Sequence, residues 1–189
     1  MRDEVQHSGL IAGSIEARGY QLEAVDEALS GSMLLVLPTA AGKTAVAWMV
    51  IAERLRTNSG GVIFLAPTNA LVDQHLKSLE PVMKHIHDLN PISITGEITP
   101  KKRENLCDSS RLIIATPHVV RNDVVKGILN LSNCCLLVVD EAHHATGNHP
   151  MAQAAELYNS QAEDGLILAT TASPGSRTEV VEEICGRLD

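Results

Sequence analysis

The stretch Leu37-Pro38-Thr39-Ala40-Ala41-Gly42-Lys43-Thr44 lies between an apolar run, Met33–Leu37, and a helix-like segment, Ala45–Arg56. A buried strand that leads through a short loop into a helix forms a cradle for polyphosphate, because backbone N–H groups and the helix dipole both face the anion. In such a loop Lys43 supplies a cation, and the Thr44 hydroxyl can ligate Mg²⁺. The predicted phosphate-binding residues are Pro38, Thr39, Ala40, Ala41, Gly42, Lys43 and Thr44.

This loop departs from the strict phosphate-loop pattern. The pattern G-x-x-x-x-G-K-[ST] has glycine where this chain has Leu37. A looser form, Pro-Thr-Gly-x-Gly-Lys-Thr, has glycine where this chain has Ala40. If the backbone at residue 40 takes a positive φ, alanine is mildly strained there. The Gly42-Lys43-Thr44 core is intact, so we expect nucleotide binding to be retained.

Short apolar, β-branched runs alternate with helix-like segments along the chain. This alternation predicts an α/β domain with right-handed crossovers and a mostly parallel sheet covered by helices on both faces. The predicted strands are Met33–Leu37, Gly61–Leu65, Pro91–Thr95, Arg111–Ala115, Cys134–Val139 and Gly165–Ala169. Each ends in a polar or Gly/Pro-containing loop, and ligands of open parallel sheets bind beyond the carboxyl ends of the strands. We therefore expect these loops to form one functional rim.

Composition restricts the surfaces that the chain can offer. A length of 189 residues suits one domain, and 44% hydrophobic with 20% charged residues indicates a folded aliphatic core. A net charge of -8 argues against a surface that coats nucleic acid, so contacts with phosphates must be local. The one dense basic cluster, Lys101-Lys102-Arg103, is interpreted as a solvated helix face.

Neither a signal-like N-terminus nor an apolar run of about 18 residues occurs in the sequence. We expect an intracellular protein without membrane contact, cytoplasmic and nucleoid-associated if its source is prokaryotic. The four cysteines have no Cys-x-x-Cys spacing and are expected to be free thiols in a reducing compartment. They are Cys107, Cys134, Cys135 and Cys185.

Asp140 and Glu141 follow the apolar run Leu136–Val139 at a predicted strand end. An acid in that place can hold Mg²⁺ through its water shell, and the next can orient and deprotonate a water that attacks a γ-phosphate. The alternative is a helix N-cap pair, which suits either acid alone but not the pair together with a Gly-Lys-Thr loop. We assign Thr44 and Asp140 to the metal, and Lys43, Asp140 and Glu141 to catalysis.

Histidines near Asp140 lack a Cys or a second acidic cluster that would complete a metal site. We expect His143 instead to act with the catalytic group and to hydrogen-bond the loop of Thr171 and Ser173, which links phosphate chemistry to movement. The remaining histidines away from this segment are expected on the surface or on helix faces; they are His7, His75, His85, His87 and His118.

Arg18, Tyr20 and Gln21 lie just before the first predicted helix, upstream of the phosphate-binding loop. A glutamine amide presents a donor and an acceptor together, which matches the N6/N7 edge of adenine. We therefore predict that Gln21 reads adenine, with Arg18 beside it.

These segments together resemble the ordered motifs of the first RecA-like domain of a superfamily 2, DEAH-box helicase. The matching motifs are Tyr20-Gln21, residues 38–44, Ala66-Pro-Thr-Asn-Ala-Leu-Val72, Thr95-Gly96, Thr116-Pro117, Asp140-Glu-Ala-His143 and Thr171-Ala-Ser-Pro-Gly175. The resemblance covers essentially residues 1–189 and implies a RecA-like P-loop NTPase domain with a sheet of about six or seven strands. It implies ATP and Mg²⁺ as cofactors, and coupling through Thr171 and Ser173. The residues that it places on one nucleic-acid strand are Pro67, Thr68, Thr95, Gly96, Thr116 and Pro117.

Within the superfamily, the segments Ile94–Glu97, Ala115–Asp123 and Thr171–Gly175 look most like the archaeal Hef and FANCM group. Such proteins are ATP-driven translocases of DNA repair that act on forks and other branched DNA. Two alternatives stay open. One is an RNA helicase of the RIG-I or Dicer type, and the other is a nucleotide-binding adaptor that does not hydrolyse ATP, against which the intact Glu141 counts.

A helicase of this kind closes ATP between two RecA-like domains, and the second supplies arginine fingers. Nothing in this chain resembles that second domain, so we expect either a fragment of a longer protein, in which the second domain is its partner, or a natural half-helicase. Because an arginine finger is worth about 10³–10⁵ in rate, the isolated domain is expected to be nearly inactive.

Overall fold

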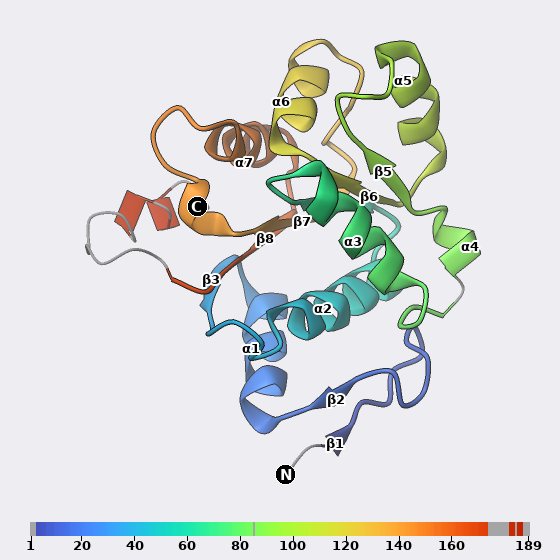
Figure 1. The fold of residues 1–189 in the computed structure, drawn as a ribbon, viewed down its shortest axis with the longest axis vertical. Helices are drawn as coiled ribbons and strands as arrows, with labels where there is room; N and C mark the ends of the chain where they lie inside the picture. Colours follow the sequence, from blue (N-terminus) through green and yellow to red (C-terminus); the bar gives the residue numbers. More distant parts are fainter. Residues whose placement is uncertain (1–2, 85, 174–181, 184, 187–189) are drawn as a thin grey trace.

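The computed structural model describes residues 3–84, 86–173, 182–183 and 185–186 (Figure 1). At its centre is a six-stranded sheet with the strand order β3-β8-β7-β4-β6-β5, in which all neighbours are parallel. The strands are β3 (Met33–Val36), β4 (Gly61–Leu65), β5 (Ile92–Ile94), β6 (Leu112–Ala115), β7 (Cys134–Asp140) and β8 (Leu166–Thr171). The six predicted strands and the parallel sheet are thus confirmed, and only strand ends differ.

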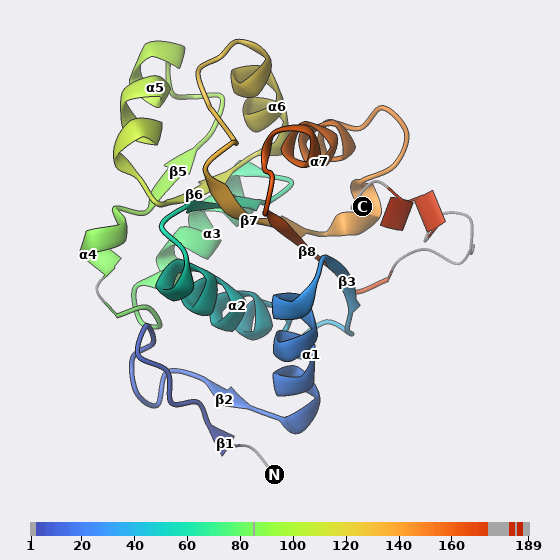
Figure 2. The same cartoon turned by 180° about the vertical axis from the view of Figure 1, so that it is seen from behind.

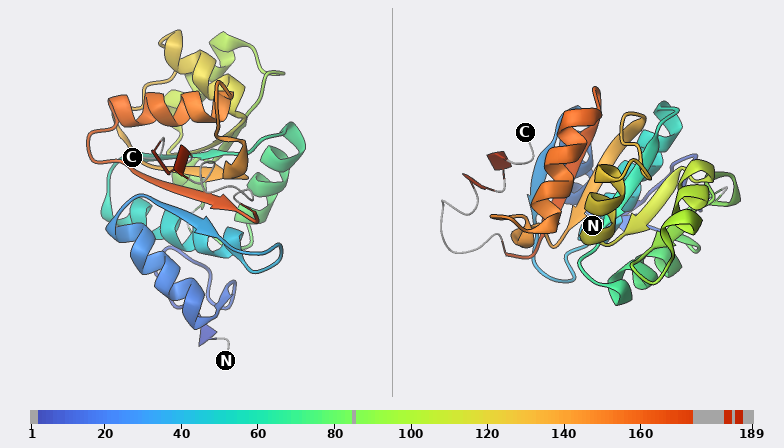
Figure 3. Two further views of the ribbon diagram at one scale, coloured as in Figure 1. Left: turned by 90° about the vertical axis from the view of Figure 1, so that its left-hand side faces the viewer. Right: turned by 90° about the horizontal axis from the view of Figure 1, so that it is seen from above.

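Helices cover both faces of this sheet, as the continuous apolar character of its strands predicts. Figures 1 and 2 show α1 and α2 on one side and α5, α6 and α7 on the other, and Figure 3 shows the layers edge-on. The helices are α1 (Gly19–Ser30), α2 (Lys43–Thr57), α3 (Asn69–Leu79), α4 (Ile86–Leu89), α5 (Pro100–Ser109), α6 (Pro117–Val125) and α7 (Pro150–Gln161), with a 3₁₀ turn η1 (Ala142–His144).

Alternate residues of the central strands build two separate cores. Val62 and Phe64 of β4 pack with α1, α2 and α3 residues, whereas Ile63 and Leu65 pack with residues of α6 and α7. Side chains of a strand point alternately to its two faces, so an uninterrupted apolar run supplies both cores at once. No described helix has the length and apolar character to cross a membrane.

A short N-terminal segment packs beside α1 and α2. Its strands β1 (Asp3–Glu4) and β2 (Glu16–Ala17) pair antiparallel, and its Leu10 bridges to Met83. His7 Nε2 lies 2.8 Å from Glu53 Oε2 on α2, which fixes the segment to the main body.

The basic cluster on α5 is not the uniformly solvated face that the sequence suggested. Lys101 and Lys102 are exposed, but Arg103 is buried. Its guanidinium meets the buried carboxylate of Asp123 on α6, with Nε 2.5 Å from Oδ2 and Nη2 2.6 Å from Oδ1. The prediction is therefore wrong for Arg103, which joins two helices through an internal ion pair.

The four cysteines are free thiols in the structure. Burial raises the pKa of Cys107 to about 11 and that of Cys134 to about 12. Since the thiolate is the reactive form, these two side chains are chemically inert at neutral pH.

Candidate nucleotide and nucleic-acid site

Strand order divides the carboxyl edge of the sheet into two halves. The loops after β3, β8 and β7 carry the predicted nucleotide-binding residues, and these strands are consecutive in the sheet. The loops after β4, β6 and β5 carry the predicted nucleic-acid residues, and these strands are consecutive as well. We call these the nucleotide half and the nucleic-acid half of the rim. Parallel strands end at a common edge, so the two halves lie side by side.

The phosphate loop, residues 38–44, has the backbone that its sequence suggested. Gly42 takes a φ of 91°, and a Cβ at that position would collide with the side-chain amide of Gln21. Helix α2 begins at Lys43, whose Nζ donates to the carbonyl oxygens of Leu37 at 3.0 Å and Pro38 at 3.4 Å. The ammonium group thus lies folded over the loop, where a phosphate would compete for it. The Thr44 side chain is exposed at the same helix end.

Ala40 takes a φ of 62°, a conformation that favours glycine. We expect Ala40→Gly to raise the free energy of unfolding by about 1 kcal/mol, because it removes the steric cost of a Cβ in the left-handed region. Urea unfolding followed by circular dichroism measures the change. Ala41→Gly is the matched control: residue 41 has no positive φ, so this change is expected to lower stability by about 0.5–1 kcal/mol. Equal effects of the two changes would contradict the strain at residue 40.

Gln21 holds the phosphate loop in place through a hydrogen bond to its backbone. Its buried amide donates from Nε2 to the Ala41 carbonyl at 2.9 Å, while Oε1 accepts from the Arg18 backbone N–H at 2.7 Å. The Tyr20 hydroxyl donates to the same Ala41 oxygen at 2.9 Å. Both ends of the Gln21 amide are therefore engaged by the protein, whereas the Arg18 side chain is exposed.

Asp140 ends β7, the strand of the nucleotide half that adjoins β4 of the nucleic-acid half. Its Oδ1 accepts from Thr170 Oγ1 on β8 at 2.9 Å, and its Oδ2 lies 3.0 Å from His75 Nε2 on α3. Burial alone raises the pKa of this carboxyl, but hydrogen bonds from His75 and Thr170 outweigh it and hold the pKa below its ordinary value. Asp140 is therefore ionised at neutral pH.

A divalent cation suits this donor set. The Asp140 carboxylate accepts hydrogen bonds from His75, Thr170 and the Glu141 backbone N–H, and since a carboxylate has about four acceptor sites, it keeps capacity for a metal ion or its water. Together with the exposed Thr44 hydroxyl, these are the hard oxygen donors that Mg²⁺ prefers, and Mg²⁺ commonly keeps several of its waters. The residues present therefore fit Mg²⁺.

The contact of His75 with Asp140 is not predicted by the sequence, in which His75 is one of the histidines expected on the surface or on helix faces. His75 is on α3, but it is only 6% exposed and turned inward. The signal that could have found it was a histidine on a helix face otherwise made of Leu71, Leu76 and Leu79, directly after a rim loop.

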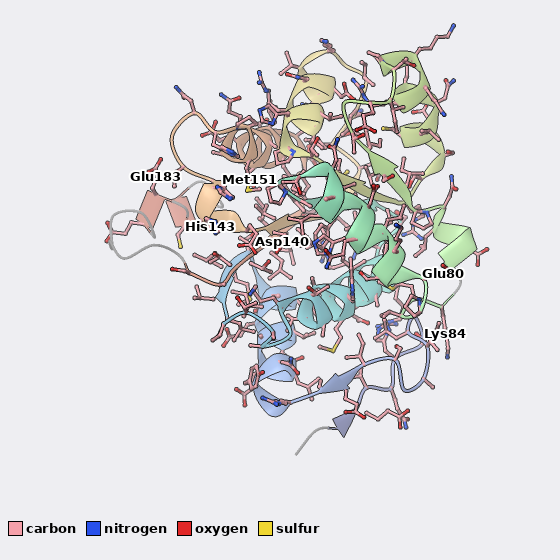
Figure 4. The ribbon with its side chains drawn as sticks, in the orientation of Figure 1. Glu80, Lys84, Asp140, His143, Met151 and Glu183 are labelled. Atoms are coloured by element: carbon pink, nitrogen blue, oxygen red, sulfur yellow. The ribbon has the colours of Figure 1, made fainter. Side chains whose placement is uncertain are left out.

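Glu141 and His143 lie beside Asp140, on the turn that follows β7; Asp140 and His143 are labelled close together in Figure 4. Glu141 takes a φ of 53°, which is uncommon for a residue with a side chain and is typical of functional turns. His143 Nδ1 lies 3.3 Å from Glu141 Oε2 and 3.0 Å from Thr171 Oγ1. The predicted contact of His143 with Thr171 is thus present, and Thr171 in turn donates to the Ser173 carbonyl at 3.0 Å.

Predicted contacts in the nucleic-acid half differ in exposure. Thr68 and Gly96 are exposed and Pro67 is half-buried. Thr95, Thr116 and Pro117 are buried, and the Thr116 amide donates to the Ile94 carbonyl at 3.3 Å. The outer surface of this half therefore comes from the loops that hold Thr68 and Gly96.

Comparison with known proteins agrees with this arrangement. The family model of the DEAD/DEAH box helicases matches residues 18–181. This chain belongs to the DEAD/DEAH box helicase family. As a helicase-family domain it superposes on the crystal structure of the Pyrococcus furiosus Hef helicase domain with a TM-score of 0.86 and 36% sequence identity, covering 91% of this chain and 36% of that one. The predicted RecA-like α/β fold and the resemblance to the Hef group are confirmed.

Two curated relatives extend this comparison of the helicase domain. MJ1505 of Methanocaldococcus jannaschii, provisionally named an ATP-dependent RNA helicase, is 41% identical over 184 residues, 97% of this chain and 23% of that protein. The ATP-dependent DNA helicase MPH1 of Candida glabrata is 34% identical over 190 residues, 100% of this chain and 18% of that protein. The chain thus spans less than a quarter of the length of either relative.

Proposed function

We propose that this chain is the ATP-binding half of an ATP-dependent helicase or translocase that acts on forked or branched DNA. One observation carries the proposal: the strand order brings the phosphate loop, Asp140 with Glu141, and Thr171 together, directly beside the predicted nucleic-acid loops. A machine that couples nucleotide turnover to movement on a strand needs these two sites next to each other.

Each residue of the nucleotide half has a role in this proposal. Lys43 and the loop amides bind phosphates. Gln21 and Arg18 lie at the end of the site where the adenine of the nucleotide would bind. Thr44 and Asp140 hold Mg²⁺, which neutralises phosphate charge when bound. Glu141 orients a water molecule and accepts its proton. His143 connects Glu141 to Thr171 and Ser173, the coupling segment, through the contacts described above.

Nucleic acid is proposed to bind through its backbone. An acidic chain with few basic rim residues suits contacts from the Thr68 hydroxyl and from the backbone at Gly96, which hold phosphates without reading bases. The other predicted contacts would support the exposed rim loops by packing beneath them; they are Pro67, Thr95, Thr116 and Pro117. DNA is favoured by the resemblance to the Hef and FANCM group and by the name of MPH1, a DNA helicase, whereas the name of MJ1505 favours RNA.

The test is ATP hydrolysis by this chain alone and by this chain followed by the second RecA-like domain that we propose for the full-length protein. Fork DNA, duplex DNA and duplex RNA are added in turn, and Glu141→Gln is the control that keeps nucleotide binding. We expect slow hydrolysis and no unwinding from the chain alone, and hydrolysis stimulated by fork DNA in the longer protein. Stimulation by duplex RNA alone would support the RNA helicase instead, and ATP binding without turnover in every case would support an adaptor.

A further inference from the structure

We propose that His75 is a positioning residue that holds the Asp140 carboxylate ready for Mg²⁺-dependent nucleotide binding. This inference rests on the proposed function, since it concerns the metal-binding acid of the same site. It assigns a role to a histidine that lies 65 positions away from Asp140 in the chain.

The contact between the two side chains is sheltered from solvent. The side chain of His75 is 7% exposed and that of Asp140 is 14% exposed, and Nε2 lies 3.0 Å from Oδ2. An ionised carboxylate only accepts hydrogen bonds, so Nε2 carries the proton and donates it. The hydrogen bond thereby selects one tautomer of the imidazole and one orientation of its ring.

Packing holds the imidazole ring in that orientation. The ring of Phe64 lies 4.5 Å away, centroid to centroid, and the ring of Trp48 meets it edge-on at 6.0 Å. Phe64 comes from β4 and Trp48 from α2, and both are buried. Because the donor is fixed by packing, it can fix the rotamer of the acceptor, as donors beside metal-binding groups commonly do.

The other oxygen of Asp140 is held independently by Thr170 on β8. Two side-chain donors on different elements, together with the Glu141 backbone N–H, therefore hold the carboxylate against rotation, and its remaining acceptor capacity is available to a metal or its water. His75 belongs to α3, whose N-cap is Thr68 in the nucleic-acid half of the rim. The His75–Asp140 bond thus joins an element of one half to the metal-binding acid of the other.

Nucleotide affinity with and without Mg²⁺ tests this role. ADP binding to the 189-residue chain is measured by calorimetry in excess Mg²⁺ and in EDTA. His75→Phe keeps an aromatic ring but removes the donor, and we expect it to reduce the gain in affinity from Mg²⁺ by about tenfold, leaving the affinity in EDTA unchanged. His75→Gln keeps an N–H donor and is expected to retain most of the gain. His118→Phe, at an exposed histidine, is the matched control and is expected to behave as the unmodified chain.

Three outcomes would overturn the inference: an unchanged Mg²⁺ gain in His75→Phe, an equal loss of affinity with and without Mg²⁺, or equal losses in the Gln and Phe variants. If the unmodified chain binds no ADP at all, the proposed function fails instead. Should His75→Phe not fold by circular dichroism, nitrogen NMR of the unmodified chain replaces it. Addition of Mg²⁺ to the ADP complex is then expected to shift the Nε2 resonance of His75, and an unmoved resonance would contradict the proposal.

Discussion

Replacing Lys43 with alanine is expected to weaken ATP and ADP binding by about 10- to 100-fold, since a hydrogen bond to a charged group is worth about 1.5–3 kcal/mol. In the structure the ammonium group donates hydrogen bonds to the carbonyl oxygens of Leu37 and Pro38. A bound phosphate offers it an opposite charge instead, at the N-terminal end of α2, where the helix dipole adds to the attraction. The variant loses this gain and also loses the group that closes the loop.

Calorimetry with ADP in Mg²⁺ measures the loss in this variant. Lys126→Ala is the matched control, because Lys126 is exposed at the end of α6 and carries the same charge. It is expected to bind ADP as the unmodified chain does, so the effect of Lys43 cannot be ascribed to net charge. Equal affinities of the Lys43 and Lys126 variants would refute the assignment of residues 38–44 as a phosphate site.

Arg103→Ala is expected to lower the free energy of unfolding by about 3–5 kcal/mol. The Arg103 guanidinium and the Asp123 carboxylate form a bidentate ion pair between α5 and α6. The Arg103 side chain is 8% exposed and that of Asp123 is 2% exposed. Truncation of the arginine leaves the carboxylate buried without its counter-charge. A cost of this size is a large fraction of the stability of a single domain.

Urea denaturation measures this loss, and Lys102→Ala on the same helix is the control. Lys102 is exposed, so its removal is expected to change stability by no more than about 0.5 kcal/mol. The double variant Arg103→Met with Asp123→Leu removes both charges and is expected to recover much of the loss. A single Arg103 variant as stable as the Lys102 variant would show that the pair contributes nothing.

Local patterns predicted the framework of this domain well. Each strand of the sheet is a short apolar run, and such runs are local properties of the sequence. The positive φ at Ala40 follows from a loop pattern that has glycine there, and the contact between His143 and Thr171 follows from neighbouring strand ends. These features depend on the order of elements more than on side-chain packing.

Contacts between elements that are distant in the chain could not be predicted from these local patterns. In the sequence, Arg103 is one of three adjacent cations, and only the packing of α6 shows that it pairs with Asp123. His75 likewise has the pattern of an ordinary helix residue, and only the fold shows that it contacts Asp140 at the end of β7. The burial of Thr95 and Thr116 likewise depends on how the rim loops pack. No short pattern encodes these pairings, because each joins segments that meet only in the assembled fold.

The division of the sheet edge into two adjoining groups of strands has a consequence for how such domains diversify. In the proposed function the loops after β4, β6 and β5 hold the nucleic acid, so substitutions there would alter which polymer is bound without disturbing the loops after β3, β8 and β7. In this way the nucleotide site would stay unchanged while the nucleic acid that the domain binds changes. Relatives named for DNA and for RNA both align with nearly the whole of this chain, as such a modular edge allows.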